Sequence, residues 1–130
     1  IIVIAAAGNE KSELTPKKPK NLYYPASYPL KNIISVMNNS KHSQRSPSSN
    51  YGSNVSVSAP GVRIKSFSHN GEKEIMTGTS QSSPVVTALV AYLKAIDPSL
   101  KVDEIKMLLK LGSKKVVGFE GFNAAGGVLT

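Results

Sequence analysis

The chain opens with seven apolar residues in a row, Ile1 to Ala7, and this run ends at Gly8-Asn9. A half-exposed strand alternates apolar and polar residues, whereas an unbroken apolar run of this length is typical of a strand buried on both faces. Such strands occur in parallel sheets that helices cover. The first residues therefore predict a parallel sheet, with Asn9 at the C-terminal edge of one strand.

The sequence predicts four further strands, namely Asn32–Met37, Val55–Val57, Val62–Phe67 and Glu74–Met76. Asn70-Gly71 lies between the last two of these, and this dipeptide is a strong signal for a β-hairpin. Residues 10–31 contain four prolines and a charge cluster, and residues 38–53 are rich in Ser and Asn, so both segments predict loops.

Two helices are expected in the second half of the chain. Residues from Val85 to Ile96 leave almost no polar face, which is typical of a buried helix. This helix should end at Asp97-Pro98, because the residue before a proline avoids the helical region. A second helix is predicted over Val102–Leu111, with Gly112 suited to its C-terminal cap. Strands followed by helices indicate an α/β fold, with a mostly parallel sheet and a buried long helix.

Composition excludes several classes of function. The chain lacks cysteine, which removes disulfides, thiolate metal sites and a cysteine nucleophile. The net charge is +8, but the local cluster Lys17-Lys18-Pro19-Lys20 is typical of a solvated loop rather than of a site for an acidic partner. Only 6% of the residues are aromatic, and no segment reaches the ~18 apolar residues of a membrane span. We therefore expect neither a nucleic-acid partner nor a membrane partner.

Ser80 lies between a glycine-bearing turn, Gly78-Thr79, and the start of the apolar helix. A serine at such a place can expose its hydroxyl, and the positive end of the helix dipole can stabilise an anion that forms beside it. Its own backbone N–H can also point at that anion. The alternative is a serine that caps the helix, which is a common arrangement and is favoured when this run is taken alone.

Asn9 is the second candidate for a functional site. It follows a predicted buried strand and a glycine, and ligand clefts of parallel sheets gather at this edge. An uncharged amide is a suitable hydrogen-bond donor for an oxyanion. The alternative is an asparagine that merely serves a turn, and it is favoured when the residue is taken alone.

Together these segments resemble the subtilisin-like serine proteases, the subtilase family. Ala5 to Glu10 is similar to the oxyanion loop of that family, and Gly78 to Pro84 is similar to its nucleophile motif. Four segments between them agree in order and spacing, namely Tyr24–Pro29, Ile33–Val36, Ser49–Gly52 and Ser58–Val62, and Gly127–Leu129 resembles the strand after the last helices. The resemblance covers nearly the whole chain.

The resemblance implies a role for each matching position. Ser80 would be the acylated nucleophile, and Asn9 would donate its side-chain amide to the oxyanion, with the backbone N–H of Ser80 as the second donor. The pocket for the substrate residue before the scissile bond would be lined by Ala6, Ala7, Gly8 and Tyr23. A side chain as large as Tyr23 at the floor would reshape this pocket, and Glu10 at its rim would favour basic substrate residues.

Two positions depart from the usual nucleophile motif of the family. Gln81 stands where the family usually has Met, which makes the site less sensitive to oxidants, and Ser82 stands where it usually has Ala.

The resemblance to the subtilase family also implies that these 130 residues lack the catalytic base. The family order is Asp, then His, then Ser. The only histidines are His42 and His69, both in loop-like segments after Asn9, and no Asp precedes Asp97. We therefore expect both histidines at the surface. We also expect residue 1 to be a cut inside a larger protein, with residues 1–130 forming the C-terminal portion of a subtilase catalytic domain.

The leading hypothesis is a serine endopeptidase that acts on polypeptides, whose isolated C-terminal portion is inactive without the N-terminal half of the peptidase domain. The alternative is a non-catalytic relative or fragment that serves as an interaction domain. A basic binding module has only the net charge in its favour. No cofactor is evident, and calcium is left open for the longer protein by the resemblance, which alone also implies a secreted or periplasmic location.

Overall fold

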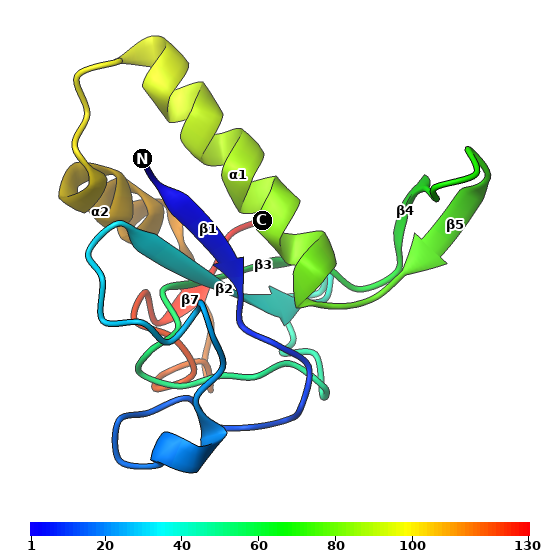
Figure 1. Cartoon of the computed structure of the whole chain (residues 1–130), viewed down its shortest axis with the longest axis horizontal. Helices are drawn as coiled ribbons and strands as arrows, with labels where there is room; N and C mark the ends of the chain where they lie inside the picture. Colours follow the sequence, from blue (N-terminus) through cyan, green and yellow to red (C-terminus); the bar gives the residue numbers. More distant parts are fainter.

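A computed structural model describes all 130 residues, and its centre is a three-stranded parallel sheet (Figure 1). The strand order is β1 (Val3–Ala6), β2 (Ile33–Asn39) and β3 (Val57–Pro60). Val3 pairs with Ile33, and Val36 pairs with Val57. These strands and the two helices confirm the α/β fold class with a mostly parallel sheet.

The strand that is buried on both faces is β2, not β1. All seven residues of β2 are buried, whereas only Ala5 is buried among the four residues of β1. The prediction of a doubly buried first strand was wrong because β1 lies at the edge of the sheet, and no strand of this chain pairs with its outer side. The apolar run still forms a parallel strand, as its composition indicates.

Helix α1 (Thr79–Ile96) crosses one face of the sheet and contacts β1, β2 and β3. Its buried residues lie on one side of the helix, at Thr79, Ser82, Val86 and Val90. The prediction of a helix buried all round was wrong for the opposite side, where Tyr92 and Ile96 are exposed. The apolar character of that side has no packing partner in this chain.

Helix α2 (Val102–Gly112) packs through Ile105 and Leu109 into the same core as α1. Its N-terminus is closed by the Glu104 carboxylate, which accepts a hydrogen bond from the backbone N–H of Lys101 at 2.6 Å. The helix begins and ends within one residue of its predicted bounds. Neither helix of the structure combines the length and the apolar character that a membrane span requires.

The opposite face of the sheet is covered by loops and by the C-terminal segment. That segment contains a short antiparallel pair, β6 (Lys114–Lys115) and β7 (Gly127–Val128). A second core cluster lies under it, made of Ala7, Leu14, Met37, Val55, Phe119 and Val128. The chain around the sheet therefore fixes the position of residues 7 to 9, where β1 ends.

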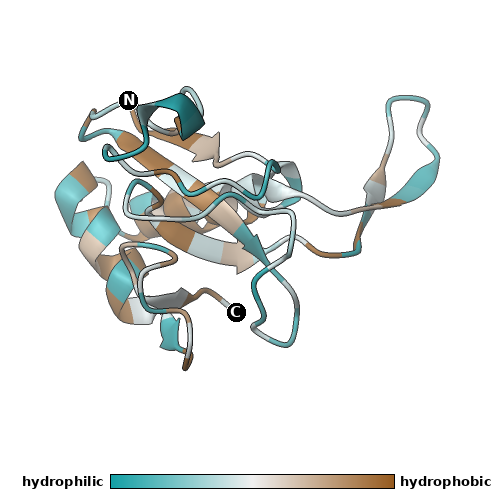
Figure 2. Cartoon of the chain, turned by 90° about the horizontal axis from the view of Figure 1, so that it is seen from below, coloured by the Kyte–Doolittle hydropathy of each residue, from teal (hydrophilic) through white to brown (hydrophobic).

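Strands β4 (Ile64–Phe67) and β5 (Lys73–Met76) form the predicted antiparallel hairpin. It projects from the body of the molecule, and Figure 2 shows that it is more hydrophilic than the sheet. Gly71 supplies the positive φ of the turn, +83°. Because β5 leads through Thr77 directly into α1, the hairpin and the start of the helix are continuous.

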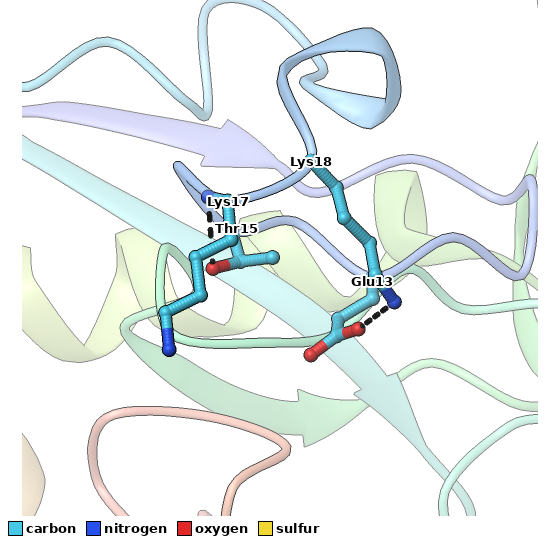
Figure 3. Close-up of polar contacts among 4 residues, drawn as sticks. All are labelled: Glu13, Thr15, Lys17 and Lys18. Carbon is cyan, nitrogen blue, oxygen red and sulfur yellow. Dashed lines mark hydrogen bonds and ion pairs between the residues drawn. The ribbon is translucent and has the colours of Figure 1, made fainter.

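The basic cluster at residues 17–20 is exposed, and it includes the 3-10 turn η1 (Pro19–Asn21). Figure 3 shows the ammonium group of Lys18 paired with the carboxylate of Glu13, while the backbone N–H of Lys17 donates to Thr15 Oγ1 at 3.5 Å. The hydrogen bond that Lys18 donates to Glu13, followed by the negative charge of that carboxylate, raises the pKa of Lys18. This segment is a solvated loop.

Candidate active site

The turn that carries Ser80 is formed by Thr77 and Gly78, which join β5 to α1. Gly78 is the residue that caps the helix, and its backbone is extended, with φ 165° and ψ 170°. Ser80 is the second residue of the helix and is exposed. The interpretation of Ser80 as a capping serine is therefore wrong, and its hydroxyl makes no hydrogen bond to any other group of the chain.

Asn9 lies beside this turn, although 70 residues of sequence separate the two. The backbone N–H of Thr79 donates to Asn9 Oδ1 at 3.0 Å, and the N–H of Gly8 donates to Thr79 Oγ1 at 3.1 Å. Thr79 is fully buried, so both hydrogen bonds are shielded on its side. The amide nitrogen of Asn9 donates no hydrogen bond within the chain, and the Asn9 side chain is exposed.

This arrangement has a chemical consequence for the amide of Asn9. Because its oxygen is held by the backbone of residue 79, its nitrogen is directed elsewhere and remains available as a donor. A Cβ atom at Gly78 would lie 3.4 Å from that nitrogen, so the amide stands directly against the turn before Ser80. A hydroxyl, an amide donor and the N-terminus of an 18-residue helix are thus gathered at one place.

The residues expected to line a substrate pocket lie next to Asn9. Ala7 and Gly8 are buried after β1, and Ala6 is half-buried within it, paired with Val36. The ring of Tyr23 lies against Gly8, since a Cβ atom at Gly8 would be only 3.0 Å from Tyr23 Cδ2. The φ angle of Gly8 is +97°, so glycine is favoured there on conformational grounds as well.

Asn50 holds the loop after β1, and the sequence did not single out this residue by itself. Its side chain is buried, with Nδ2 donating to the carbonyl of Ala7 at 2.8 Å and to Glu10 Oε2 at 2.6 Å. Its Oδ1 accepts the backbone N–H groups of Glu10 and Ser12 at 3.0 and 2.8 Å. The only sequence signal was a polar residue inside the segment Ser49–Gly52, which carried the family resemblance.

Glu10 is therefore hydrogen-bonded to Asn50 rather than free at the pocket rim.

Gln81 is half-buried and donates from Nε2 to Met76 Sδ at 3.7 Å, which links the start of α1 to the end of β5. The chain holds no group of three or more His, Cys, Asp or Glu side chains that lie together, so its residues do not provide a carboxylate cluster for calcium.

The residues that could act as a base are remote from Ser80 or face solvent. His42 and His69 are both exposed, as expected, and His69 lies at the turn of the projecting hairpin. Asp97 follows the opposite end of α1, about 25 Å from Ser80 at the rise of an α-helix. The structure thus brings together Ser80, Asn9 and the pocket residues, and no hydrogen bond joins a histidine side chain or Asp97 to them.

Known proteins are similar to this chain in sequence and in architecture. The model of the subtilase family matches residues 1–127. A cell wall-associated protease of Bacillus subtilis (strain 168) is 34% identical over 110 residues, which are 85% of this chain and 11% of that protein. The subtilisin-like proteinase Mp1 of Magnaporthiopsis poae is 36% identical over 129 residues, covering 93% of this chain and 29% of the relative.

Solved structures agree with the sequence comparison. A cold adapted subtilisin-like serine proteinase superposes with a TM-score of 0.74 at 26% identity, covering 96% of this chain and 41% of the other. The A-subunit of the AB5 toxin from E. coli shares the fold, with a TM-score of 0.84 at 22% identity, over 98% and 47% of the two chains. The chain spans less than a third of the curated relatives cited above and under half of these structures. It belongs to the subtilase family.

Proposed function

We propose that this chain is the serine-bearing C-terminal portion of the catalytic domain of a serine endopeptidase. Ser80 attacks the carbonyl carbon of a peptide bond and becomes acylated, and water later hydrolyses the acyl-enzyme. The amide nitrogen of Asn9 and the backbone N–H of Ser80 stabilise the oxyanion. The observation that carries this proposal is the hydrogen bond from Thr79 N–H to Asn9 Oδ1, which leaves Asn9 Nδ2 free beside the nucleophile.

The base comes from residues outside the 130 in this proposal. A serine hydroxyl needs a neighbouring imidazole to take its proton, and a carboxylate to orient that imidazole. The exposure of His42 and His69 and the distance of Asp97 support a base that another segment supplies. The chain alone is then inactive, and no cofactor is needed for the reaction.

Two uncovered surfaces support an N-terminal portion that packs against this one. The outer edge of β1 has no strand partner, and the side of α1 that faces away from the sheet is apolar and exposed at Tyr92 and Ile96. A hollow between β1 and α1 is lined mainly by apolar side chains, among them Ile2, Ile4 and Val90. A further strand and its connections would bury these groups.

The substrate is a polypeptide in this proposal, with a small residue before the scissile bond. Tyr23 against Gly8 leaves little room at the pocket floor, and the carboxylate of Glu10 is engaged by Asn50 instead of by substrate. We place the enzyme outside the cytoplasm, in a secreted or periplasmic location, because the relatives include a cell wall-associated protease.

A fluorophosphonate probe tests the proposal on the full-length protein that contains this chain. The probe should label Ser80, and S80A should abolish both labelling and peptide hydrolysis, because the hydroxyl is the atom acylated. Ser83 provides a control, since its hydroxyl is engaged with the carbonyl of Thr79 at 2.9 Å, and S83A should still label. Full-length protein that does not label, or hydrolysis that survives S80A, would favour a non-catalytic interaction domain.

A further inference from the structure

One buried polar side chain in the structure has no hydrogen-bond partner, that of Asn38 near the end of β2. It is fully buried, yet neither its amide nitrogen nor its amide oxygen is bonded. The adjacent Asn39 is also buried but fully engaged, donating to the carbonyl of Ser40 at 2.9 Å and accepting from Ser58 Oγ at 2.7 Å. Because an unpaired buried amide costs free energy, the position of Asn38 calls for a functional explanation.

The amide of Asn38 lies behind the turn that carries the nucleophile. A Cβ atom at Gly61 would be 2.6 Å from Asn38 Oδ1, 2.7 Å from the carbonyl oxygen of Gly78 and 2.1 Å from Ser82 Oγ. The three oxygens therefore converge on one small space above Gly61.

The chemistry of this space favours a donor from Asn38. The carbonyl of Gly78 can only accept hydrogen bonds, and Ser82 Oγ already donates to the carbonyl of Ala59 at 3.0 Å, so it presents lone pairs. The amide oxygen of Asn38 forms no hydrogen bond with these two acceptors. Rotating the side-chain amide by 180° exchanges its oxygen and nitrogen, so that its N–H groups face the Gly78 carbonyl and Ser82 Oγ. The Gly78 carbonyl already accepts the backbone N–H of Gln81 at 3.1 Å, and it then gains a second donor through its other lone pair.

That carbonyl belongs to the same peptide group as the N–H of Thr79, which donates to Asn9 Oδ1. A trans peptide is planar, and its C=O and N–H point in opposite directions. The carbonyl of the peptide between Gly78 and Thr79 thus points toward the buried Asn38, and the N–H of the same peptide points toward the exposed amide of Asn9. Fixing one end of this rigid group fixes the direction of the other.

We propose that Asn38 is a positioning residue for Asn9. Its amide N–H donates to the carbonyl of Gly78, holds the plane of the 78–79 peptide, and so keeps the Thr79 N–H aligned with Asn9 Oδ1. The amide nitrogen of Asn9 then points at the oxyanion. This inference rests on the proposed function, since it assigns Asn38 a part in the same reaction.

The test uses the full-length protein with N38L, which keeps a similar volume and removes the donor. We expect kcat per labelled active site to fall about tenfold with KM unchanged, less than the ~10²–10³-fold known for loss of a subtilisin oxyanion asparagine. N39L is the matched control, because Asn39 makes its bonds to Ser40 and Ser58, and it should lower stability while kcat per labelled site is preserved. An unchanged kcat in N38L would overturn the proposal.

A double-mutant cycle separates positioning from general destabilisation. In an N9A background the effect of N38L on kcat should disappear, because Asn38 acts only through Asn9. Additive losses would contradict the proposal. The S80A variant distinguishes failure of the proposed function from failure of the positioning role of Asn38. Hydrolysis that survives S80A contradicts the proposed function, regardless of the kcat of N38L.

A crystal structure of the unmodified full-length protein decides the question where N38L does not fold. Asn38 Nδ2 should lie within about 3.2 Å of the Gly78 carbonyl oxygen. An amide bonded elsewhere, or one that keeps its oxygen toward Gly78, would overturn the proposal.

Discussion

The two sides of helix α1 differ in how completely this chain uses them. On the side that faces the sheet, Thr79 and Ser82 are buried and hydrogen-bonded, and Val86 and Val90 pack into the core. On the other side Tyr92 and Ile96 are 63% and 65% exposed. In the function that we propose, the oxyanion half of the site lies within this chain, and a segment outside these 130 residues covers the outer surface of the helix.

The largest expected effect concerns the base. If the outer segment supplies the imidazole, the 130-residue chain alone should hydrolyse peptides about 10⁶-fold more slowly than the full-length protein, the loss measured when subtilisin loses its catalytic histidine. Turnover of a fluorogenic peptide at equal protein concentrations measures the difference. A rate for the isolated chain close to that of the full-length protein would place a base within residues 1–130.

The second prediction tests the site on the sheet side of α1 by removing the amide donor of Asn9. In the full-length protein N9A should lower kcat by about 10²–10³ and leave KM nearly unchanged, because the donor acts on the oxyanion; this magnitude was measured for a subtilisin. Asn70 lies in the hairpin turn, so N70A is the control and should keep full activity. Equal kcat values for the two variants would remove Asn9 from the site.

The third prediction tests whether the outer side of α1 is covered in the full-length protein, by truncating the side chain of Tyr92. In the full-length protein Y92A should destabilise the fold by about 3 kcal/mol, since we expect its ring to be buried there. V117A is the control, because Val117 is almost completely exposed, and its effect should stay within about 0.5 kcal/mol. Urea unfolding followed by circular dichroism gives both values. A neutral Y92A would mean that this side of the helix faces solvent.

The smallest effect is at the C-terminal end of α1. Hydrogen bonds from the hydroxyl and the backbone N–H of Ser99 lower the pKa of Asp97 below its ordinary value of 3.8. The folded pKa is the lower one, so this stabilisation is complete above pH 3.8 and is lost as the pH falls through the folded pKa. NMR titration should show the depressed pKa, and S99A should move it upward. No movement in S99A would assign the shift to another group.

Much of the fold could be predicted because local signals agreed with the tertiary structure. The apolar run before Gly8 did form a parallel strand, Asn70-Gly71 did form the hairpin turn, and Asp97-Pro98 did end the long helix. The burial of β1 and α1 was overestimated for one reason. An apolar composition predicts that a surface is covered, but it does not say whether the covering element lies in the same segment of chain.

The supporting residues of the site could not be predicted. Asn50 and Asn38 are single polar residues in segments without periodicity. Asn50 is hydrogen-bonded to residues between 7 and 12, and Asn38 Oδ1 and the Gly78 carbonyl both lie close to Gly61. Such contacts depend on how the ends of β1, β2 and α1 meet. Family motifs indicated Ser80 and Asn9, whereas side chains that hold them in place leave no local pattern.

The hydrogen bond between Thr79 and Asn9 joins residues 70 apart in sequence, and this has a consequence for biosynthesis. Contacts of such long range form only after the entropy of closing the intervening loop has been overcome, and they tend to form late in folding. If Asn9 is the oxyanion donor, as we propose, a nascent or partly folded chain carries Ser80 without that donor. Under the proposed function, peptide hydrolysis would therefore begin only after this contact has formed.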